Sequence, residues 1–579
     1  MCTRVAHEKP ESRLTWVKKS LCILGLAAAV PVFAATEQPN IVLIMIDDLG
    51  YTDVGAYGSE IDTPNIDAIA AQSFKFTDAH ALPSCAPTRA ALMTGQDQHR
   101  VGLGSQNQIY PPGASGDMPG YKGSLEGDYI GLADLLKQAG YSTFIAGKWH
   151  LGHEEGQLPK DLGFEDSVVL LDAVASHYGD QLGPSPHISE TGTGKASYMR
   201  NDTPMDSLPA DFYSTTFYSD EFIRMLDSAK EKEQPFFGFL SYTAVHDPLH
   251  APQELVEKYT DRYNGNFIEL REARIKGACE QGILQNCDAA TRWPENTPDW
   301  NALTDRQKYE LQKRMATYAG MMDFTDQELG RVINHLKANG QYDNTLIIVM
   351  SDNGASAMPA TAYIKGESED IWQQKHYPNR KIEDFGKPGS FVSMGSPNAQ
   401  ASSGVFYAYK LTVFEGGTRI PMLVKLPGKG EGQITHAVTH VSDLYPTLVD
   451  FAGGDLNGQT NLIGSSMRPL LEGNSSVVRE NGEYGMAWMG WRVYRQGDWK
   501  LIFMSEGFGG TGQYALYNLK DDPGETTDLS GIEKDKLKEL SDKWAAYARA
   551  NNIVESPMDV VNSGMNRTVK RFTGVDWSE

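Results

Sequence analysis

The chain has 579 residues, which is too long for one compact core and favours two domains. Its composition of 40% hydrophobic, 10% aromatic and 22% charged residues is that of an ordinary globular protein. The formal net charge of -23 argues against a nucleic acid or an anionic membrane surface as a partner. It also means that an anionic substrate would need a local basic pocket.

Residues 1–34 have the pattern of a secretory signal peptide. Basic residues precede an apolar run at residues 21–30, which is too short to span a bilayer as a stable helix. Small residues at the end of this segment favour cleavage after Ala34, and an uncleaved anchor is the alternative. Because we find no second long apolar run, we expect a mature protein without a membrane segment, in the periplasm or secreted.

The five cysteines are two pairs and a single residue. Cys2 and Cys22 lie in the signal peptide and would leave with it. Cys279 and Cys287 are eight residues apart in a polar segment, so they could close a small disulfide loop in an oxidising compartment. This leaves Cys85 as the odd cysteine, which indicates a reactive or modified residue.

Short apolar runs along the chain suit strands that are buried in a parallel sheet. They occupy residues 40–46, 141–146, 235–240, 345–350 and 422–426. Ligands of open α/β sheets bind beyond the carboxyl ends of the strands, so polar residues that follow these runs are candidate site residues. The candidates are Asp47, Asp48, Lys148, His150, His246, Asp352 and Asn353.

Each candidate also has a plain structural interpretation. Asp47 and Asp48 repel each other unless a cation lies between them, but one could cap a helix while the other is solvated. The Lys-x-His segment could be a solvated loop, and the Asp-Asn-Gly segment could be a simple turn. His250 competes with His246 for a role in the site, and its alternative is a loop histidine.

Helical periodicity and capping residues predict the helices. They cover residues 63–71 with capping chemistry at Thr63, 131–139, 211–229, 304–339 with a cap at Thr304 and a break near 323–326, 442–453 and 532–551. Three long stretches, residues 165–210, 253–302 and 355–404, have no assigned element.

The pattern of the sequence changes near residue 460, from long apolar runs and helices to short aromatic segments, and we place a domain boundary there. Residues 35–460 would form the catalytic domain and residues 461–579 a C-terminal subdomain. The second part has short aromatic segments separated by turns, which predict a small antiparallel sheet, and it ends in the helix over 532–551. The segments are 484–488, 491–495, 499–503 and 514–519.

Residues 83–96 read Pro-Ser-Cys-Ala-Pro-Thr-Arg-Ala-Ala-Leu-Met-Thr-Gly-Gln, and the rest of the chain is organised around them. A proline suits the first turn of a helix, so Cys85 lies at or just before a helix N-terminus, where negative charge is favoured. Arg89 is one turn further on the same face and adds a fixed cation. This pattern predicts a nucleophile in an anion-binding site; the alternative is a buried cysteine before an ordinary helix.

This stretch resembles the signature of the type I, formylglycine-dependent sulfatases, Cys-x-Pro-Ser/Thr-Arg-x-x-x-Leu/Met-x-Thr-Gly. Gly-Lys-Trp-His-Leu-Gly at 147–152, Asp-Asn-Gly at 352–354 and Glu-Gly-Gly-Thr-Arg-Ile-Pro at 415–421 also match the family. The resemblance covers roughly residues 38–530 and is closest to bacterial arylsulfatases. It implies the alkaline phosphatase-like α/β fold: a large, mixed, mostly parallel sheet sandwiched by helices, with a smaller C-terminal α+β domain on an antiparallel sheet.

The resemblance also implies the roles of the candidate residues. A formylglycine-generating enzyme would convert Cys85 to formylglycine, whose hydrate is the nucleophile. The implied metal ligands are Asp47, Asp48, residue 85, Asp352 and Asn353; an all-oxygen set suits Ca²⁺, with Mg²⁺ as the weaker option. The other implied catalytic residues are Arg89, Lys148, His150, His246 as the acid, and Lys410 as a second sulfate-binding lysine.

The expected reaction is hydrolysis of a sulfate ester to an alcohol or phenol and inorganic sulfate. The substrate would be an aryl sulfate, with a sulfated carbohydrate as the alternative and a phosphonate or phosphate monoester as a further one. The three unassigned stretches would then shape the rim of the pocket.

Overall fold

The computed structural model describes residues 38–106, 110–183, 195–359, 376–428, 430–456 and 458–565. The predicted signal peptide lies outside these residues. Among the helices that the structure describes, none is both long and apolar enough to cross a bilayer.

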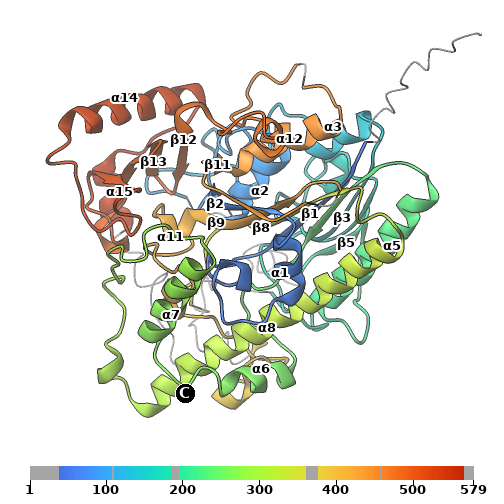
Figure 1. The fold of residues 1–579 in the computed structure, drawn as a ribbon, viewed down its shortest axis with the longest axis horizontal. Helices are drawn as coiled ribbons and strands as arrows, with labels where there is room; N and C mark the ends of the chain where they lie inside the picture. The colour runs from blue at the N-terminus through green and yellow to red at the C-terminus, as the bar shows by residue number, and fades with distance from the viewer. Residues whose placement is uncertain are drawn as a thin grey trace, which may run out of the picture. The chain divides into compact units, whose positions relative to one another are not determined.

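A large mixed sheet forms the centre of the molecule (Figure 1). Its strands lie in the order β10 (Gln433–Thr435), β2 (Phe74–His80), β9 (Arg419–Lys425), β8 (Thr345–Ser351), β1 (Asn40–Ile46), β7 (Phe236–Ser241), β3 (Ser142–Lys148), β4 (Asp166–Leu170), β5 (Tyr198–Arg200) and β6 (Thr203–Pro204), with β11 (Thr439–His440) paired to β2. The five strands from β8 to β4 run parallel, and β9 joins β8 in antiparallel fashion. The five predicted strands are present as β1, β3, β7, β8 and β9, but β9 is antiparallel to both of its neighbours, so the expectation of a parallel strand is wrong for it.

Helices cover both faces of this sheet, because alternate residues of its central strand point to opposite sides. Val42, Ile44 and Ile46 of β1 face a core that contains residues of α1 (Pro64–Ala70), α5 (Ser214–Glu231) and α8 (Asp305–Ala338). Ile41, Leu43 and Met45 face a second core with α2 (Cys85–Thr94), α3 (Leu132–Gln138) and α12 (Leu444–Phe451). The predicted sandwich of helices around a mostly parallel sheet is confirmed.

The second sheet is antiparallel and has four consecutive strands. They are β12 (Tyr484–Trp488), β13 (Trp491–Gln496), β14 (Trp499–Phe503) and β15 (Tyr514–Asn518). One face packs on α14 (Lys534–Ala550), and the other joins a core with Tyr407 and Phe414 of the first part of the chain. The predicted antiparallel sheet is confirmed, and the domain boundary near residue 460 stays a prediction.

Three details of the helices differ from expectation. The helix α8 is continuous, because Asp323 and Asp326 bind neighbouring elements instead of breaking it: Asp326 accepts hydrogen bonds from the backbone of Asn65 (3.1 Å) and Ile66 (2.8 Å). The side chain of Thr63 does not cap α1. The carboxylate of Asp326 accepts the backbone hydrogen bond of the first turn in its place. A further helix, α15 (Met558–Met565), follows the one expected to close the chain.

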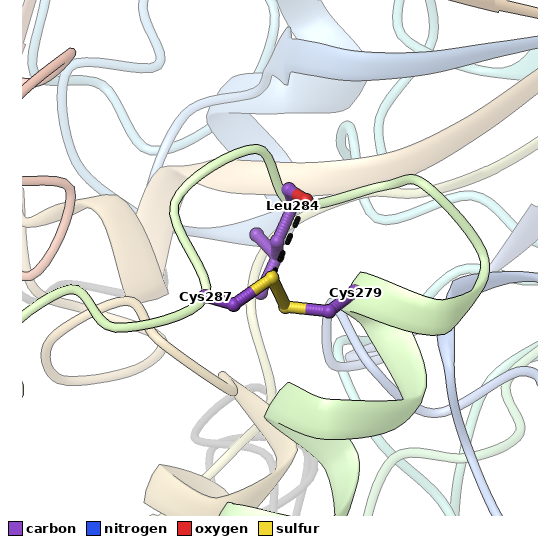
Figure 2. The surroundings of a disulfide bond; sticks show 3 residues. All are labelled: Cys279, Leu284 and Cys287. Atoms are coloured by element: carbon purple, nitrogen blue, oxygen red, sulfur yellow. Dashed lines mark hydrogen bonds between the residues drawn. A yellow bond between two sulfur atoms is a disulfide. The ribbon is translucent and has the colours of Figure 1, made fainter.

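The unassigned stretches contain regular structure. Residues 165–210 include β4, β5 and β6, and residues 253–302 include α6 (Gln253–Thr260) and α7 (Phe267–Glu280). The disulfide between Cys279 and Cys287 joins the last turn of α7 to the loop that follows it (Figure 2). Within the described residues, the remaining α-helices are α10 (Ser396–Ser402), α11 (Glu415–Thr418) and α13 (Arg468–Leu471).

Candidate active site

The carboxyl ends of four neighbouring parallel strands deliver the candidate residues to one edge of the large sheet. Asp47 and Asp48 follow β1, His150 follows β3, His246 lies in the loop after β7, and Asp352 and Asn353 follow β8, while Lys148 is the last residue of β3. Cys85 and Arg89 come from α2, and Lys410 from the segment before α11. All of these side chains are buried.

Unusual backbone conformations aim several of these side chains. Asp48 and His150 have φ angles of 61° and 57°, in the left-handed region that non-glycine residues seldom adopt. Such positions cost energy and cluster at functional sites. Gly147 has φ of 125°, and a Cβ there would lie 1.8 Å from the carbonyl oxygen of Ser241. Glycine at 147 therefore lets β3 approach β7 just before Lys148.

Cys85 is the first residue of α2, which confirms its predicted place at a helix N-terminus, and Ser84 is the N-cap residue. The thiol lies 3.8 Å from Nζ of Lys410. Burial raises the pKa of Cys85. The positive charges of Lys148 and Lys410 lower this pKa, and the negative charges of Asp47 and Asp352 raise it further. An unmodified thiol here is thus held in its neutral form, so burial works against a cysteine thiolate as the nucleophile.

Each acidic residue of the site lies against a basic one. Nζ of Lys148 lies 2.6 Å from Oδ2 of Asp47, and Nζ of Lys410 lies 2.7 Å and 2.9 Å from the two oxygens of Asp48. Nη2 of Arg89 donates to Oδ2 of Asp352 at 2.9 Å. Burial lowers the pKa of Lys410. The negative charges around its ammonium group, that of Asp48 most of all, raise the pKa by more, so the net shift is upward.

The acidic residues also have the oxygens that a hard cation needs. Ligand atoms of Asp47, Cys85 and Asp352 all lie within 4.8 Å of one another. Burial raises the pKa of Asp352, and the negative charge of Asp47 raises it further. This upward shift shows that the two carboxylates lie close together in a buried place. Within the part of the chain that the structure describes, the buried Oδ1 atoms of Asp47 and Asn353 have no hydrogen-bond partner. Carboxylate and amide oxygens in this state fit Ca²⁺ or Mg²⁺.

The structure separates the two histidines that compete in the loop after β7. Nε2 of His246 lies 3.4 Å from Oδ2 of Asp48, inside the site. His250 lies away from these groups: its Nε2 is 2.7 Å from the carbonyl oxygen of Ser390, and its Nδ1 is 3.3 Å from the backbone nitrogen of His177. His250 is a fully buried histidine of this loop, in line with the alternative of a loop histidine.

Burial lowers the pKa of both site histidines. For His150, Lys148 and Arg89 add to this effect; for His246, Asp48 opposes it and Lys410 adds to it. Both rings are therefore neutral at pH 7 when no anion is bound, and an anionic ligand nearby would favour their protonated forms.

Two residues of the site were missed in the sequence. Ser241, the last residue of β7, accepts a hydrogen bond from Nη1 of Arg89 (2.6 Å) and donates to the carbonyl oxygen of Lys148 (2.8 Å). The Nε2 of His177 lies 3.1 Å from the carbonyl oxygen of His246. The position of Ser241 at a strand end could have marked it, whereas His177 lies in an unassigned stretch with no motif.

Comparison with known proteins decides the family. The family described as Sulfatase matches residues 39–454, and a second one, described as N-sulphoglucosamine sulphohydrolase, C-terminal, matches residues 404–547. The chain belongs to the sulfatase family. It is 32% identical to an uncharacterized sulfatase of Schizosaccharomyces pombe over 93% of this chain and 98% of that protein. It is 34% identical to the arylsulfatase of Klebsiella aerogenes over 75% of this chain and 92% of that one.

Solved structures agree with this assignment. The structure of Ps i-CgsB in complex with k-i-k-neocarrahexaose matches with a TM-score of 0.63 and 26% identity over 92% of this chain and 98% of that chain. The phosphonate monoester hydrolase of Agrobacterium radiobacter, with a TM-score of 0.53 and 21% identity, shares the fold. The predicted family and fold are confirmed, and the sulfatase is a sulfuric ester hydrolase.

Proposed function

We propose that this sulfatase hydrolyses aryl-type sulfate esters with formylglycine at position 85 and a bound Ca²⁺ ion. The observation that carries the proposal is the position of residue 85 at the N-terminus of α2, beside Lys410 and among Asp47 and Asp352. When present, formylglycine hydrate supplies a nucleophile for sulfur, and Ca²⁺ held by Asp47, Asp48, Asp352 and Asn353 supplies positive charge for the sulfate oxygens.

The remaining steps are assigned to this chain's own residues. Lys148 and Lys410 turn from their carboxylates to bind non-bridging oxygens of the sulfate group. The carboxylate of Asp352, which Arg89 holds through the bond at 2.9 Å, accepts the proton of the attacking hydroxyl of residue 85. His246, protonated beside the bound anion, gives its proton to the leaving oxygen, and His150 accepts a proton from the residue at position 85 as sulfate departs.

A sulfated carbohydrate is the second candidate substrate. It is favoured by the similarity to Ps i-CgsB, whose structure with k-i-k-neocarrahexaose spans nearly the same length of chain. We also propose export to the periplasm or the exterior, which the disulfide at Cys279 and Cys287 supports because such bonds persist in oxidising compartments. A formylglycine-generating enzyme would be the partner in maturation.

The test is free sulfate released from a nitrophenyl sulfate and from a panel of sulfated polysaccharides and their oligosaccharides, with formylglycine content measured first. Release from the aryl ester alone supports an arylsulfatase, and release from one polysaccharide with weak aryl activity supports a carbohydrate sulfatase. Faster cleavage of nitrophenyl phosphate or a phosphonate monoester would overturn both. Cys85→Ala should abolish release without changing the fold, and retained activity would refute the assigned nucleophile.

A further inference from the structure

The helix α7 carries two fully buried arginines one turn apart, at positions 271 and 274. This helix belongs to residues 253–302, which we expected to shape the rim of the pocket. Buried arginines are costly unless every donor is used, so their partners show what the helix holds. Those partners lie in the loop that follows Asp47 and Asp48 and in the segment that leads to Lys410.

Arg274 holds the loop that begins with the metal ligands Asp47 and Asp48. Its Nη1 donates to Oδ1 of Asp53 and to Oγ of Ser402 (2.9 Å), and its other nitrogens donate to Glu60 at 2.9 Å and 2.8 Å. The second oxygen of Asp53 accepts the backbone N–H of Gly50 at 2.9 Å. Arg274 thus fixes the turn two residues after Asp48, from a different part of the chain.

Arg271 holds the segment that leads to Lys410. Its Nε donates to the carbonyl oxygen of Gly404 at 2.7 Å and its Nη2 to that of Phe406 at 3.3 Å. Its Nη1 donates to the carbonyl oxygen of Arg292 at 2.8 Å. Burial among these neutral groups lowers the pKa of Arg271 to about 9. Arg271 therefore binds the carbonyl oxygens of Gly404 and Phe406, shortly before Lys410, with the same side chain that binds the carbonyl oxygen of Arg292.

The other end of α7 is fastened as well. Cys279 in its last turn is bonded to Cys287, and Figure 2 shows this disulfide closing the loop that contains Leu284. Gly277 of α7 packs on Gly58, where a Cβ on Gly277 would lie 2.3 Å from a carbonyl oxygen. The helix is thus a fixed support under both loops.

We propose that α7 is a clamp: Arg274 fixes the loop of the calcium ligands Asp47 and Asp48, and Arg271 fixes the segment of the sulfate-binding Lys410. Through these bonds one helix sets the separation of Lys410 from Asp48. Both arginines are positioning residues, because neither is bonded to a ligand of the site. The proposal rests on the proposed function for the identity of the two ligands, Ca²⁺ and sulfate.

The experiment measures binding rather than turnover. Arg271→Met and Arg274→Met are made in a Cys85→Ala background, and calorimetry gives the affinity of each for Ca²⁺ and for inorganic sulfate. We expect Arg274→Met to weaken Ca²⁺ binding at least 10-fold, and Arg271→Met to weaken sulfate binding at least 10-fold with a smaller change for Ca²⁺. The split is expected because each arginine holds a different loop.

Arg224→Met is the matched control. Arg224 lies on α5 and binds Asp166 and Glu221 with a side chain that is 44% exposed, so its loss removes an arginine–carboxylate pair outside the site. Its two affinities should equal those of the parent. Where a Met variant fails to fold, Arg271→Lys and Arg274→Lys replace it, since lysine keeps the charge but cannot reach all the partners at once.

The outcomes are distinct. Unchanged affinities in both variants, or equal loss of both affinities together with a lowered melting temperature, would overturn the clamp. Because residue 85 is itself an implied metal ligand, the unsubstituted protein is measured beside the Cys85→Ala parent. If neither binds Ca²⁺ or sulfate, the assigned site of the proposed function fails, and the clamp for those two ligands fails with it. Parent binding with the expected split supports both.

Discussion

His250→Gln tests the claim that His250 is a buried structural group outside the active site. The ring is fully buried, with Nε2 2.7 Å from the carbonyl oxygen of Ser390. Burial lowers its pKa from 6.5 to about 3, the nearby His177 adds to this, and the bond to Ser390 opposes it. The folded protein therefore keeps His250 neutral at pH values where the unfolded chain binds a proton.

The size of the effect follows from this difference. Because the folded pKa is the lower one, the stabilisation is complete above pH 6.5 and is lost as the pH falls from 6.5 towards 3. At about 1.4 kcal/mol per pH unit, a fully developed shift amounts to roughly 5 kcal/mol of unfolding free energy. Glutamine cannot titrate but can still donate to Ser390. The variant should thus lose about 1 kcal/mol at pH 7.5 and fall less steeply in acid.

The assay is urea unfolding, followed by tryptophan fluorescence, at intervals between pH 4 and 7.5. The slope of unfolding free energy against pH should be shallower for His250→Gln by about 1.4 kcal/mol per unit below pH 6. Identical slopes in the two proteins would refute the reasoning. As a control, turnover at pH 7.5 should stay within about threefold of wild type, whereas His246→Gln should lower it at least 100-fold.

Other predictions concern the site and its support. Gly147→Ala should destabilise the protein by at least about 3 kcal/mol in urea unfolding and abolish activity, because the new Cβ would lie 1.8 Å from the carbonyl oxygen of Ser241; a folded, active variant would contradict this. Arg89→Lys should lower kcat about 30- to 100-fold in steady-state kinetics by losing charge-assisted bonds, including that to Asp352, while an unchanged kcat would show them dispensable. Lys500→Met should cost about 3–5 kcal/mol, since it removes the cation between the buried Glu415 and Glu525, of which Glu415 keeps a contact to Arg419; a stability within 1 kcal/mol of wild type would argue against that pairing. Chelation with EDTA should stop turnover and lower the melting temperature, with recovery on adding Ca²⁺, and full activity of a metal-free sample would contradict the assigned ligands.

Much of the fold could be read from the chain because its local signals agree. Each predicted strand is an apolar run bounded by polar residues, and parallel strands place their carboxyl ends at one edge of the sheet. This alone brings Asp47, Asp352 and His246 towards one place. The helix that begins at Cys85 follows in the same way from local capping and proline preferences.

Elsewhere the local signal was overruled by packing. The acidic residues Asp323 and Asp326 suggested a break in the long helix, but their side chains bind Tyr259 and the start of α1, so the helix continues. Thr63 looks like a cap in the sequence, and its role is taken by Asp326 from a helix far along the chain. A pattern within a few residues contains no information about such distant partners.

The sequence by itself determined the family, five strands of the large sheet with most of the helices between them, and the kinds of residue that meet at the sheet edge. Only the tertiary structure decided that Lys410 reaches Asp48 across 362 residues, that His246 and not His250 enters the site, and that α7 fastens two loops. The physical reason is the distance along the chain over which each interaction acts. Hydrophobic periodicity and capping act over a few residues, whereas the position of a buried charge depends on every segment that packs around it.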